Sequence, residues 1–288
     1  MRSPQRLFPC CAVLAVLLLA SCSSEPPVSS GEVAVAARAA LPTDPADPAW
    51  RKAPVFTAAL LPQDQVEPRL LEPSTAAVRV QGFSDGTRLA LRLVWEDATR
   101  DELTAPAQFT DACAMQLPRT TEANVPAPQM GEPGRPVDIT YWRASWQGWV
   151  NGRADTIQSL HPGAVSDIYP FNAAPLAAGS PEQQAMEKRY SPARALGAGR
   201  EGPRTHAQED LEAEGPGSLN RVAAGKSEAT GSRTETGWQV VLVRPLPQGL
   251  GPGGRSQVAF AVWDGARQEV GARKMRSVWV PLALGAGR

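Results

Sequence analysis

The sequence predicts an all-β fold, mainly an antiparallel β-sandwich, with long irregular loops and one or two short helices. Two observations lead to this class. The 288 residues include 25 Gly and 28 Pro, a content that disfavours a helical bundle and suits short strands with long connections. Several short segments also alternate apolar and polar residues, whereas no long segment repeats its apolar residues about every 3.6 positions, as a helix would.

The clearest element is a hairpin over residues 76–97. Val78 and Val80 alternate with polar residues, and a turn follows at Ser84-Asp85-Gly86-Thr87. Beyond the turn, leucines at alternate positions from 89 to 93 lead to Trp95. Period-two patterns on both sides of Asp-Gly are a strong hairpin signal.

Further strands are predicted where short apolar or β-branched segments are bounded by Gly, Pro or Asp. They lie at residues 111–117, 137–146, 238–244, 257–263 and 277–282. Residues 118–136 form a Pro-rich loop. Residues 151–217 form a long irregular insertion with a short helix near 181–189.

The N-terminus has the pattern of a bacterial lipoprotein signal. Arg2 and Arg6 precede an apolar stretch at residues 7–20, which is too short for a stable membrane span. It ends in Leu-Ala-Ser-Cys22, the pattern in which the cysteine is acylated. We therefore predict a signal peptide at 1–21, lipid on Cys22, a flexible tether at 22–41 and one domain at 42–284. The predicted location is the cell envelope, on the periplasmic side, anchored to the membrane by lipid.

Charge and composition exclude several functions. The chain carries 29 basic and 29 acidic residues, whereas a nucleic-acid-binding protein needs a basic surplus. After removal of the signal and lipidation of Cys22, Cys113 is the one cysteine left, and the whole chain has two histidines. Covalent c-type haem, cysteine-bound zinc and bis-histidine haem are thereby disfavoured. No catalytic or phosphate-binding motif stands out, so we expect no substrate chemistry.

Several segments, in order along residues 42–284, resemble one family. The family is that of the haem-binding gamma subunits of ethylbenzene and dimethylsulfide dehydrogenases and of selenate and chlorate reductases. The matching segments are DPADPAW (44–50), RLVWED (92–97), FTDACAMQLP (109–118), MGEP (130–133), VDITYWRA (137–144), GWQVV (237–241) and VAFAVWDG (258–265), followed by Lys274 and Trp279.

The resemblance implies a β-sandwich that holds one non-covalent haem b between a methionine and a lysine. Those ligands correspond to Met130 and Lys274. It also implies that the chain relays electrons between an iron–sulfur subunit, which serves a molybdopterin catalytic subunit, and a c-type cytochrome. The lipoprotein signal departs from the best-known members, which are freely periplasmic.

The chemistry and positions of these residues are consistent with this ligand pair. Lysine ligates iron only when neutral, and its deprotonation at pH 7 costs roughly 4.6 kcal/mol if the pKa is near 10.4. Lys274 should therefore be buried, and Lys226 is the second choice. Met115 competes with Met130, but in a strand at 111–117 it shares a face with Cys113 and Leu117. That face suits a sandwich core, so Met130, in the loop, is predicted as the sulfur ligand.

Other candidates come from aromatic and basic residues. Trp142 is a candidate for haem contact, although in a strand it shares a face with Trp146 and would then be core. Arg135 and Arg143 are candidates for pairing with the haem propionates. A different class stays open as the alternative, an extracytoplasmic ligand-binding lipoprotein of the carbohydrate-binding-module type, because tryptophans on a β-sandwich can bind sugars.

Overall fold

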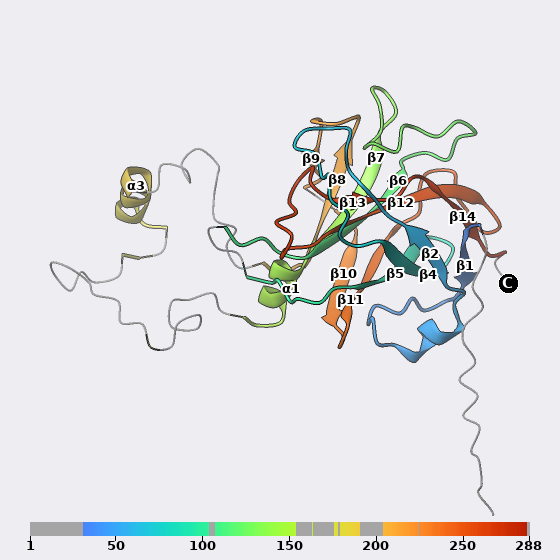
Figure 1. Ribbon diagram of the computed structural model, residues 1–288, viewed down its shortest axis with the longest axis horizontal. Coiled ribbons are helices and arrows are strands. Elements are labelled where there is room, and N and C mark those ends of the chain that lie inside the picture. Colours follow the sequence, from blue (N-terminus) through green and yellow to red (C-terminus); the bar gives the residue numbers. More distant parts are fainter. Residues whose placement is uncertain are drawn as a thin grey trace, which may run out of the picture.

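The computed structural model describes residues 31–103, 107–153, 163, 176–177, 179–190, 204–223 and 225–286. Within these residues, fourteen strands form one continuous sheet, which curls so that its two halves face each other across a hydrophobic core (Figure 1). The predicted all-β class is confirmed, and two short α-helices and one 3-10 helix complete the described elements.

The strands and helices have the following bounds. In chain order they are β1 Val33–Ala37, the 3-10 helix η1 Pro48–Lys52, β2 Phe56–Ala59, β3 Leu61–Pro62, β4 Ala77–Ser84, β5 Arg88–Glu96, β6 Ala112–Pro118, β7 Val137–Arg143, α1 Ala144–Val150, α3 Pro181–Tyr190, β8 Gln208–Ala213, β9 Asn220–Arg221, β10 Glu228–Arg233, β11 Gly237–Pro245, β12 Arg255–Trp263, β13 Met275–Arg276 and β14 Val280–Leu284.

The sheet has two layers joined by one strand. The first layer has the order β10-β11-β5-β4-β1-β14, and the second has the order β12-β6-β7-β8-β9. The start of β12 pairs with β14 and its end pairs with β6, so β12 belongs to both layers. The pairings are antiparallel except those of β1, which runs parallel to β4 and β14.

The core between the layers is built by the predicted alternation. Leu89, Leu91 and Leu93 of β5 are fully buried on one side, and Cys113, Met115 and Leu117 of β6 are fully buried on the other. Because successive side chains of a strand point to opposite faces, the residues between those of β6 lie on the outer face of the second layer.

Two predicted boundaries are wrong. Residues 33–37 of the predicted tether form β1, and Val33 and Val35 are buried, because this segment completes the first layer between β4 and β14.

The strand predicted at 137–146 ends at Arg143, and helix α1 follows. Trp142 and Trp146 therefore do not share a strand face. Gln147 fixes the helix, because its Oε1 accepts hydrogen bonds from Trp142 Nε1 (3.1 Å) and from the backbone N–H of Gly231 (2.8 Å).

The predicted insertion at 151–217 contains one strand of the domain. Residues 208–213 form β8, which pairs with β7, and the short predicted helix is present as α3. Residues 1–30, with the predicted signal and Cys22, lie outside the described residues. No helix in the part of the chain that the structure describes is long and apolar enough to cross a membrane.

Candidate functional site

A cavity of about 490 Å³ opens on the outer face of the second layer. Its floor consists of neighbouring positions on adjacent strands. Ala261, Ala114 and Tyr141 form one row across β12, β6 and β7, and Ala259, Gln116 and Ile139 form the next. Three of these six side chains are single methyl groups, so the floor is hollow and almost wholly apolar. Its volume lies in the range typical of small-molecule and cofactor sites.

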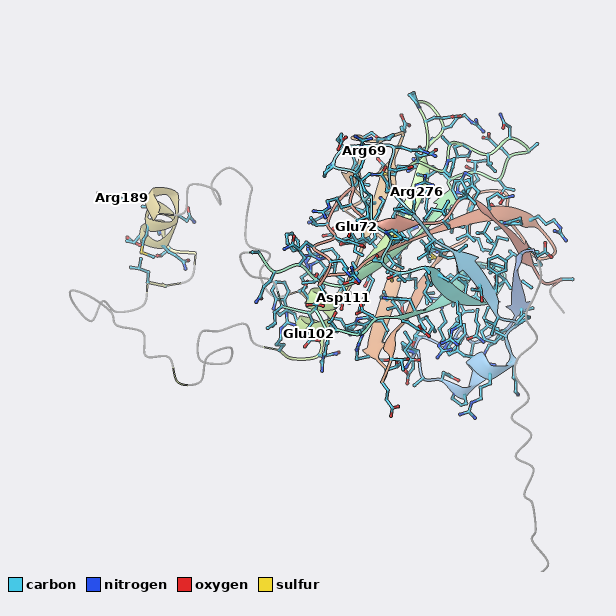
Figure 2. The ribbon with its side chains drawn as sticks, in the orientation of Figure 1. Arg69, Glu72, Glu102, Asp111, Arg189 and Arg276 are labelled. Carbon is cyan, nitrogen blue, oxygen red and sulfur yellow. The ribbon has the colours of Figure 1, made fainter. Side chains whose placement is uncertain are left out.

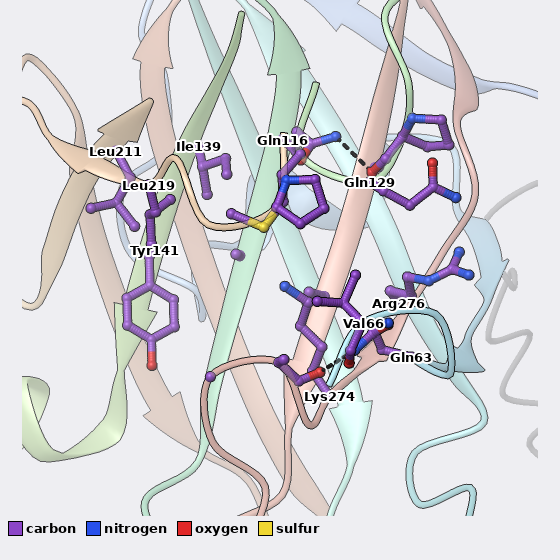
Figure 3. A pocket seen from close by; sticks show the side chains of 18 of the residues that line it. Gln63, Val66, Gln116, Gln129, Ile139, Tyr141, Leu211, Leu219, Lys274 and Arg276 are labelled. Carbon is purple, nitrogen blue, oxygen red and sulfur yellow. Dashed lines mark hydrogen bonds between the residues drawn. The ribbon is translucent and has the colours of Figure 1, made fainter. Parts of the chain in front are cut away.

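Four segments that are distant in the sequence wall this cavity (Figure 3). They are residues 63–67 after β3, residues 128–130 of the Pro-rich loop, residues 216–219 after β8 and residues 271–277 around β13. Among them are both predicted iron ligands, Met130 and Lys274. The structure thus brings together two side chains that are 144 positions apart in the chain.

Met130 occupies a strained backbone position at the cavity wall. Its φ is +68°, a left-handed conformation that residues other than glycine seldom adopt. The surroundings hold it there, because the N–H of Gly131 donates to Ala127 O (3.0 Å) and the N–H of Gly215 donates to Met130 O (2.8 Å). Strain of this kind, which costs of order 1–3 kcal/mol, persists where neighbours over-determine the conformation, and it clusters at functional sites.

Lys274 is the best-shielded of the lysine side chains that the structure describes. Lys52 and Lys226 are exposed, whereas Lys274 is half-buried, with its Nζ 5.2 Å from the ring centroid of Trp263. Burial lowers the pKa of Lys274 to about 8, and the charge of Arg276 adds to that effect. No carboxylate among the described residues forms an ion pair with Lys274, so its amine is available to a ligand in the cavity.

Arg276 is a cavity residue that the sequence analysis missed. Its side chain is 12% exposed, and among the described residues its ion pair is a loose contact of 3.9 Å with the exposed Asp64. Its buried Nε has no hydrogen-bond partner. A guanidinium that lines the cavity and is only loosely paired suits a carboxylate group of a bound ligand. The signal in the sequence is its spacing, two positions after Lys274 in an extended segment.

The other predicted haem-pocket residues lie elsewhere. Trp142 is fully buried between the layers, with its ring 6.3 Å from that of Trp95 and 5.2 Å from that of Trp238. Arg135 binds Glu132 and the carbonyl of Asn124 within the Pro-rich loop. Arg143 donates to Thr110 Oγ1 at the far end of β7 (3.2 Å). These three do not line the cavity. Strand parity turns Trp142 into the core, and contacts within the loop hold Arg135. Arg143 shares the strand face of Tyr141 but lies at the last position of β7, beyond the cavity.

The positions of the tryptophans and of Met115 decide two remaining alternatives, a sugar-binding platform and a different sulfur ligand. A sugar platform needs exposed rings, but Trp142 and Trp146 are 0% and 2% exposed. Met115 is fully buried in the core between the layers, where it lies opposite Phe260 in the register of β6 and β12. It does not line the cavity, as the parity argument predicts.

The residues at this cavity fit a haem b. A haem needs an apolar slot, axial donors and a partner for its carboxylates, and the cavity supplies an alanine-rich floor, a thioether, an amine of lowered pKa and a buried guanidinium. His206, a common haem ligand type, is exposed and does not line the cavity.

Comparison with known families decides the relationship. The family described as ethylbenzene dehydrogenase matches residues 47–275, a segment that includes Met130 and Lys274. The chain belongs to the ethylbenzene dehydrogenase family. The resemblance found in the sequence is thereby confirmed.

Two relatives align with most of this chain at low sequence identity. A protein of Haloferax mediterranei, named as a respiratory nitrate reductase heme subunit, is 24% identical over 253 residues, which cover 85% of this chain and 70% of the relative. The chlorate reductase subunit gamma of Ideonella dechloratans is 24% identical over 274 residues, which cover 90% of this chain and 89% of the relative. Among solved structures, a family 9 carbohydrate-binding module from Caldicellulosiruptor kristjanssonii aligns over 89% of this chain and 94% of the module, with 8% identity and a TM-score of 0.42. A TM-score of this size carries no functional conclusion.

Proposed function

We propose that this chain is an electron-transfer subunit of a molybdopterin oxidoreductase complex. It binds one non-covalent haem b in the cavity on the outer face of the second layer, with Met130 and Lys274 as the axial ligands. The observation that carries this proposal is the convergence of the strained Met130 and the shielded Lys274 on one apolar cavity, within the segment that matches the family. The bound haem supplies one-electron redox chemistry, and the chain itself has no substrate chemistry.

The environment of Lys274 lowers the cost of its becoming a neutral ligand. From a reference pKa near 10.4, deprotonation at pH 7 costs roughly 4.6 kcal/mol. Burial lowers the pKa of Lys274 to about 8, which reduces the remaining cost to about 1 kcal/mol. The cavity therefore favours the neutral amine that a metal ligand requires.

The rest of the cavity orients the cofactor. The row of Ala114 and Ala261 leaves space for a flat ring against the sheet, and larger side chains at these positions would fill that space. Arg276 lines the same cavity, and its guanidinium would hold a propionate of the haem.

The two relatives are named as subunits of reductases, which supports a place for this chain in an oxidoreductase complex. We propose that the haem exchanges electrons with an iron–sulfur subunit, which connects to the molybdopterin catalytic subunit, and with a c-type cytochrome. We also propose that Cys22 carries lipid and holds the chain on the periplasmic side of the membrane.

The haem proposal is tested by spectroscopy of the purified protein loaded with haem. The expected spectrum is that of a low-spin six-coordinate haem at one per chain, and acidified organic solvent should extract the haem because no covalent bond holds it. Lys274→Ala should convert the spectrum to a high-spin form. Lys226→Ala is the matched control, since Lys226 is exposed and lies outside the cavity. A low-spin spectrum that survives both Lys274→Ala and Met130→Ala would refute the proposed ligands.

The anchor is tested separately by Cys22→Ser in cells. We expect this variant to be released from membranes or to remain unprocessed, while the haem spectrum is unchanged. Membrane attachment and processing equal to those of the unaltered protein would contradict the lipid on Cys22.

A further inference from the structure

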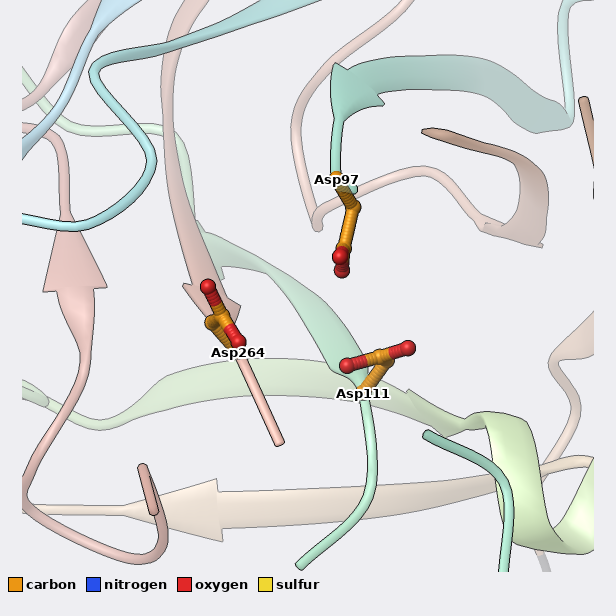
Figure 4. A group of neighbouring side chains, drawn as sticks. All are labelled: Asp97, Asp111 and Asp264. Atoms are coloured by element: carbon orange, nitrogen blue, oxygen red, sulfur yellow. The ribbon is translucent and has the colours of Figure 1, made fainter. Parts of the chain in front are cut away.

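Three aspartates converge at one end of the domain, from the ends of three strands. Asp97 directly follows β5, Asp111 directly precedes β6 and Asp264 directly follows β12. One oxygen atom of each carboxylate lies within 4.8 Å of the others (Figure 4). β5 belongs to the first layer, whereas β6 and the end of β12 belong to the second. The cluster is separate from the haem cavity, as the places of Asp111 and Arg276 in Figure 2 show.

A buried oxygen with no partner points into this cluster. Asp97 is 7% exposed, and its Oδ1 accepts hydrogen bonds from the N–H (2.9 Å) and Oγ1 (3.1 Å) of Thr99. Its Oδ2 is buried and has no hydrogen-bond partner among the described residues. The carboxylate of Asp97 points toward Asp111 and Asp264 (Figure 4). The neighbouring Asp101 also has a buried Oδ2 without a partner. A buried carboxylate oxygen without a partner is costly, so a ligand at this point would relieve the cost.

No basic side chain among the described residues forms an ion pair with the three aspartates. The side chain of Arg267 acts on Asp264 only through space. Arg233, which lies nearby, donates to the backbone carbonyl of Asp97 rather than to its carboxylate (2.6 Å). Asp111 accepts hydrogen bonds from the backbone N–H of Asp101 (2.9 Å) and Gly265 (2.9 Å) and from Trp238 Nε1 (2.8 Å), which orient its carboxylate but supply no positive charge. Like charges held together in a buried place are stable only with a counter-ion or a bound proton.

We propose that Asp97, Asp111 and Asp264 bind a divalent cation, and that Ca²⁺ is preferred. Calcium takes oxygen ligands at about 2.3–2.6 Å. The three carboxylate oxygens all lie within 4.8 Å of one another, which is close enough for them to contact one such ion. No cysteine or histidine belongs to it, and a set of oxygen donors alone selects hard cations. Mg²⁺ dehydrates reluctantly and usually keeps several waters, so a cluster in which two of the three carboxylates are buried favours Ca²⁺.

A bound cation would link the first layer to the second and would also hold the start of the loop that leads to Lys274. That loop begins at Asp264, whose N–H donates to Glu269 Oε2 (3.0 Å) and whose carbonyl accepts from the N–H of Glu269 (3.2 Å). A cation bound by Asp264 therefore fixes the start of the segment that ends at Lys274. The cation site itself does not depend on the haem.

A lanthanide gives a direct probe of the site. The indole Nε1 of Trp238 lies 2.8 Å from Asp111 Oδ2, so light absorbed by this tryptophan should sensitise Tb³⁺ bound at the cluster. We expect the purified full-length protein, treated with EDTA, to show Tb³⁺ emission on tryptophan excitation. Ca²⁺ should displace Tb³⁺ and raise the melting temperature, and Mg²⁺ should do so at least ten-fold less effectively.

Two near-isosteric variants test the assignment, each checked for folding by circular dichroism. Asp97→Asn and Asp264→Asn should each weaken Tb³⁺ and Ca²⁺ binding at least ten-fold. Asp64→Asn is the control, because Asp64 is exposed and belongs to the haem cavity side. Unchanged Ca²⁺ affinity in both cluster variants would overturn the site. The site would also be overturned if Ca²⁺ left the melting temperature of the unaltered protein unchanged while either substitution raised it. A proton shared between the carboxylates would then stabilise the cluster.

Discussion

Replacing Met130 by alanine should remove the sixth iron ligand and leave the fold intact. Met130 is half-buried at the cavity wall, and alanine tolerates its positive φ no worse than methionine does. We therefore expect the haem-free protein to lose about 1 kcal/mol of stability or less. The haem spectrum should nevertheless change from low-spin six-coordinate to high-spin, because no other described sulfur or imidazole donor lines the cavity.

Met115 provides the matched comparison for this variant. It is fully buried between the layers, so Met115→Leu should cost under about 1.5 kcal/mol, whereas Met115→Ala should cost about 2–5 kcal/mol. At about 2–4 °C per kcal/mol for a domain of this size, the latter lowers the melting temperature by roughly 4–20 °C.

The assay combines visible spectra of the haem-loaded proteins with thermal melts of the haem-free proteins. The two methionines should give opposite results: Met130→Ala changes the spectrum and hardly the stability, and Met115→Ala does the reverse. A low-spin spectrum retained in Met130→Ala and lost in Met115→Leu would refute the parity reasoning and transfer the ligand role to Met115.

Three further predictions concern the cavity wall and the hairpin. Arg276→Gln should weaken haem affinity, measured by titration, more than Arg135→Gln, because Arg276 lines the cavity and Arg135 does not; equal effects would exclude the propionate contact. Gly131→Ala should destabilise the haem-free protein by about 1–3 kcal/mol in denaturant titrations, since its Cβ would lie 2.9 Å from the carbonyl oxygens of Ala213 and Arg135 and φ is +79°; a neutral effect would contradict the close approach. Burial opposes the ionisation of Asp85, but hydrogen bonds from the backbone N–H of Arg88 and Thr87 outweigh it and lower its pKa to about 2. Stability from Asp85 is therefore present above about pH 4 and lost as pH falls toward 2, about 1 kcal/mol after screening; if Asp85→Ala shows the same acid profile as the unaltered protein, this contribution is absent.

The fold could be predicted where side-chain alternation is strict. The hairpin residues from Val78 to Trp95 alternate, and the odd-numbered positions 89–95 are buried as expected. The alternation wrongly extended the strand to Trp146. Helix α1 begins before that residue, and it is held by hydrogen bonds of Gln147 to distant residues rather than marked by an amphipathic repeat in the sequence. It also failed at β1, whose five residues of Val and Ala in a polar context become a strand only between β4 and β14.

The site could be predicted in part for a similar reason. The parity of β6 correctly assigned Met115 to the core, whereas Met130 and Lys274 were chosen through the family resemblance. Arg276 escaped because arginines are common in this chain and only the tertiary structure places its guanidinium at the cavity wall. The aspartate cluster escaped because its members come from three strand ends more than ten positions apart.

A crystal structure of the haem-loaded protein is the most direct measurement of the central proposal. We predict one haem per chain against the alanine floor of the second layer, with its iron bonded to Sδ of Met130 and Nζ of Lys274. A haem located outside this cavity, or an iron bonded to His206, Met115 or another side chain in place of these two, would contradict it.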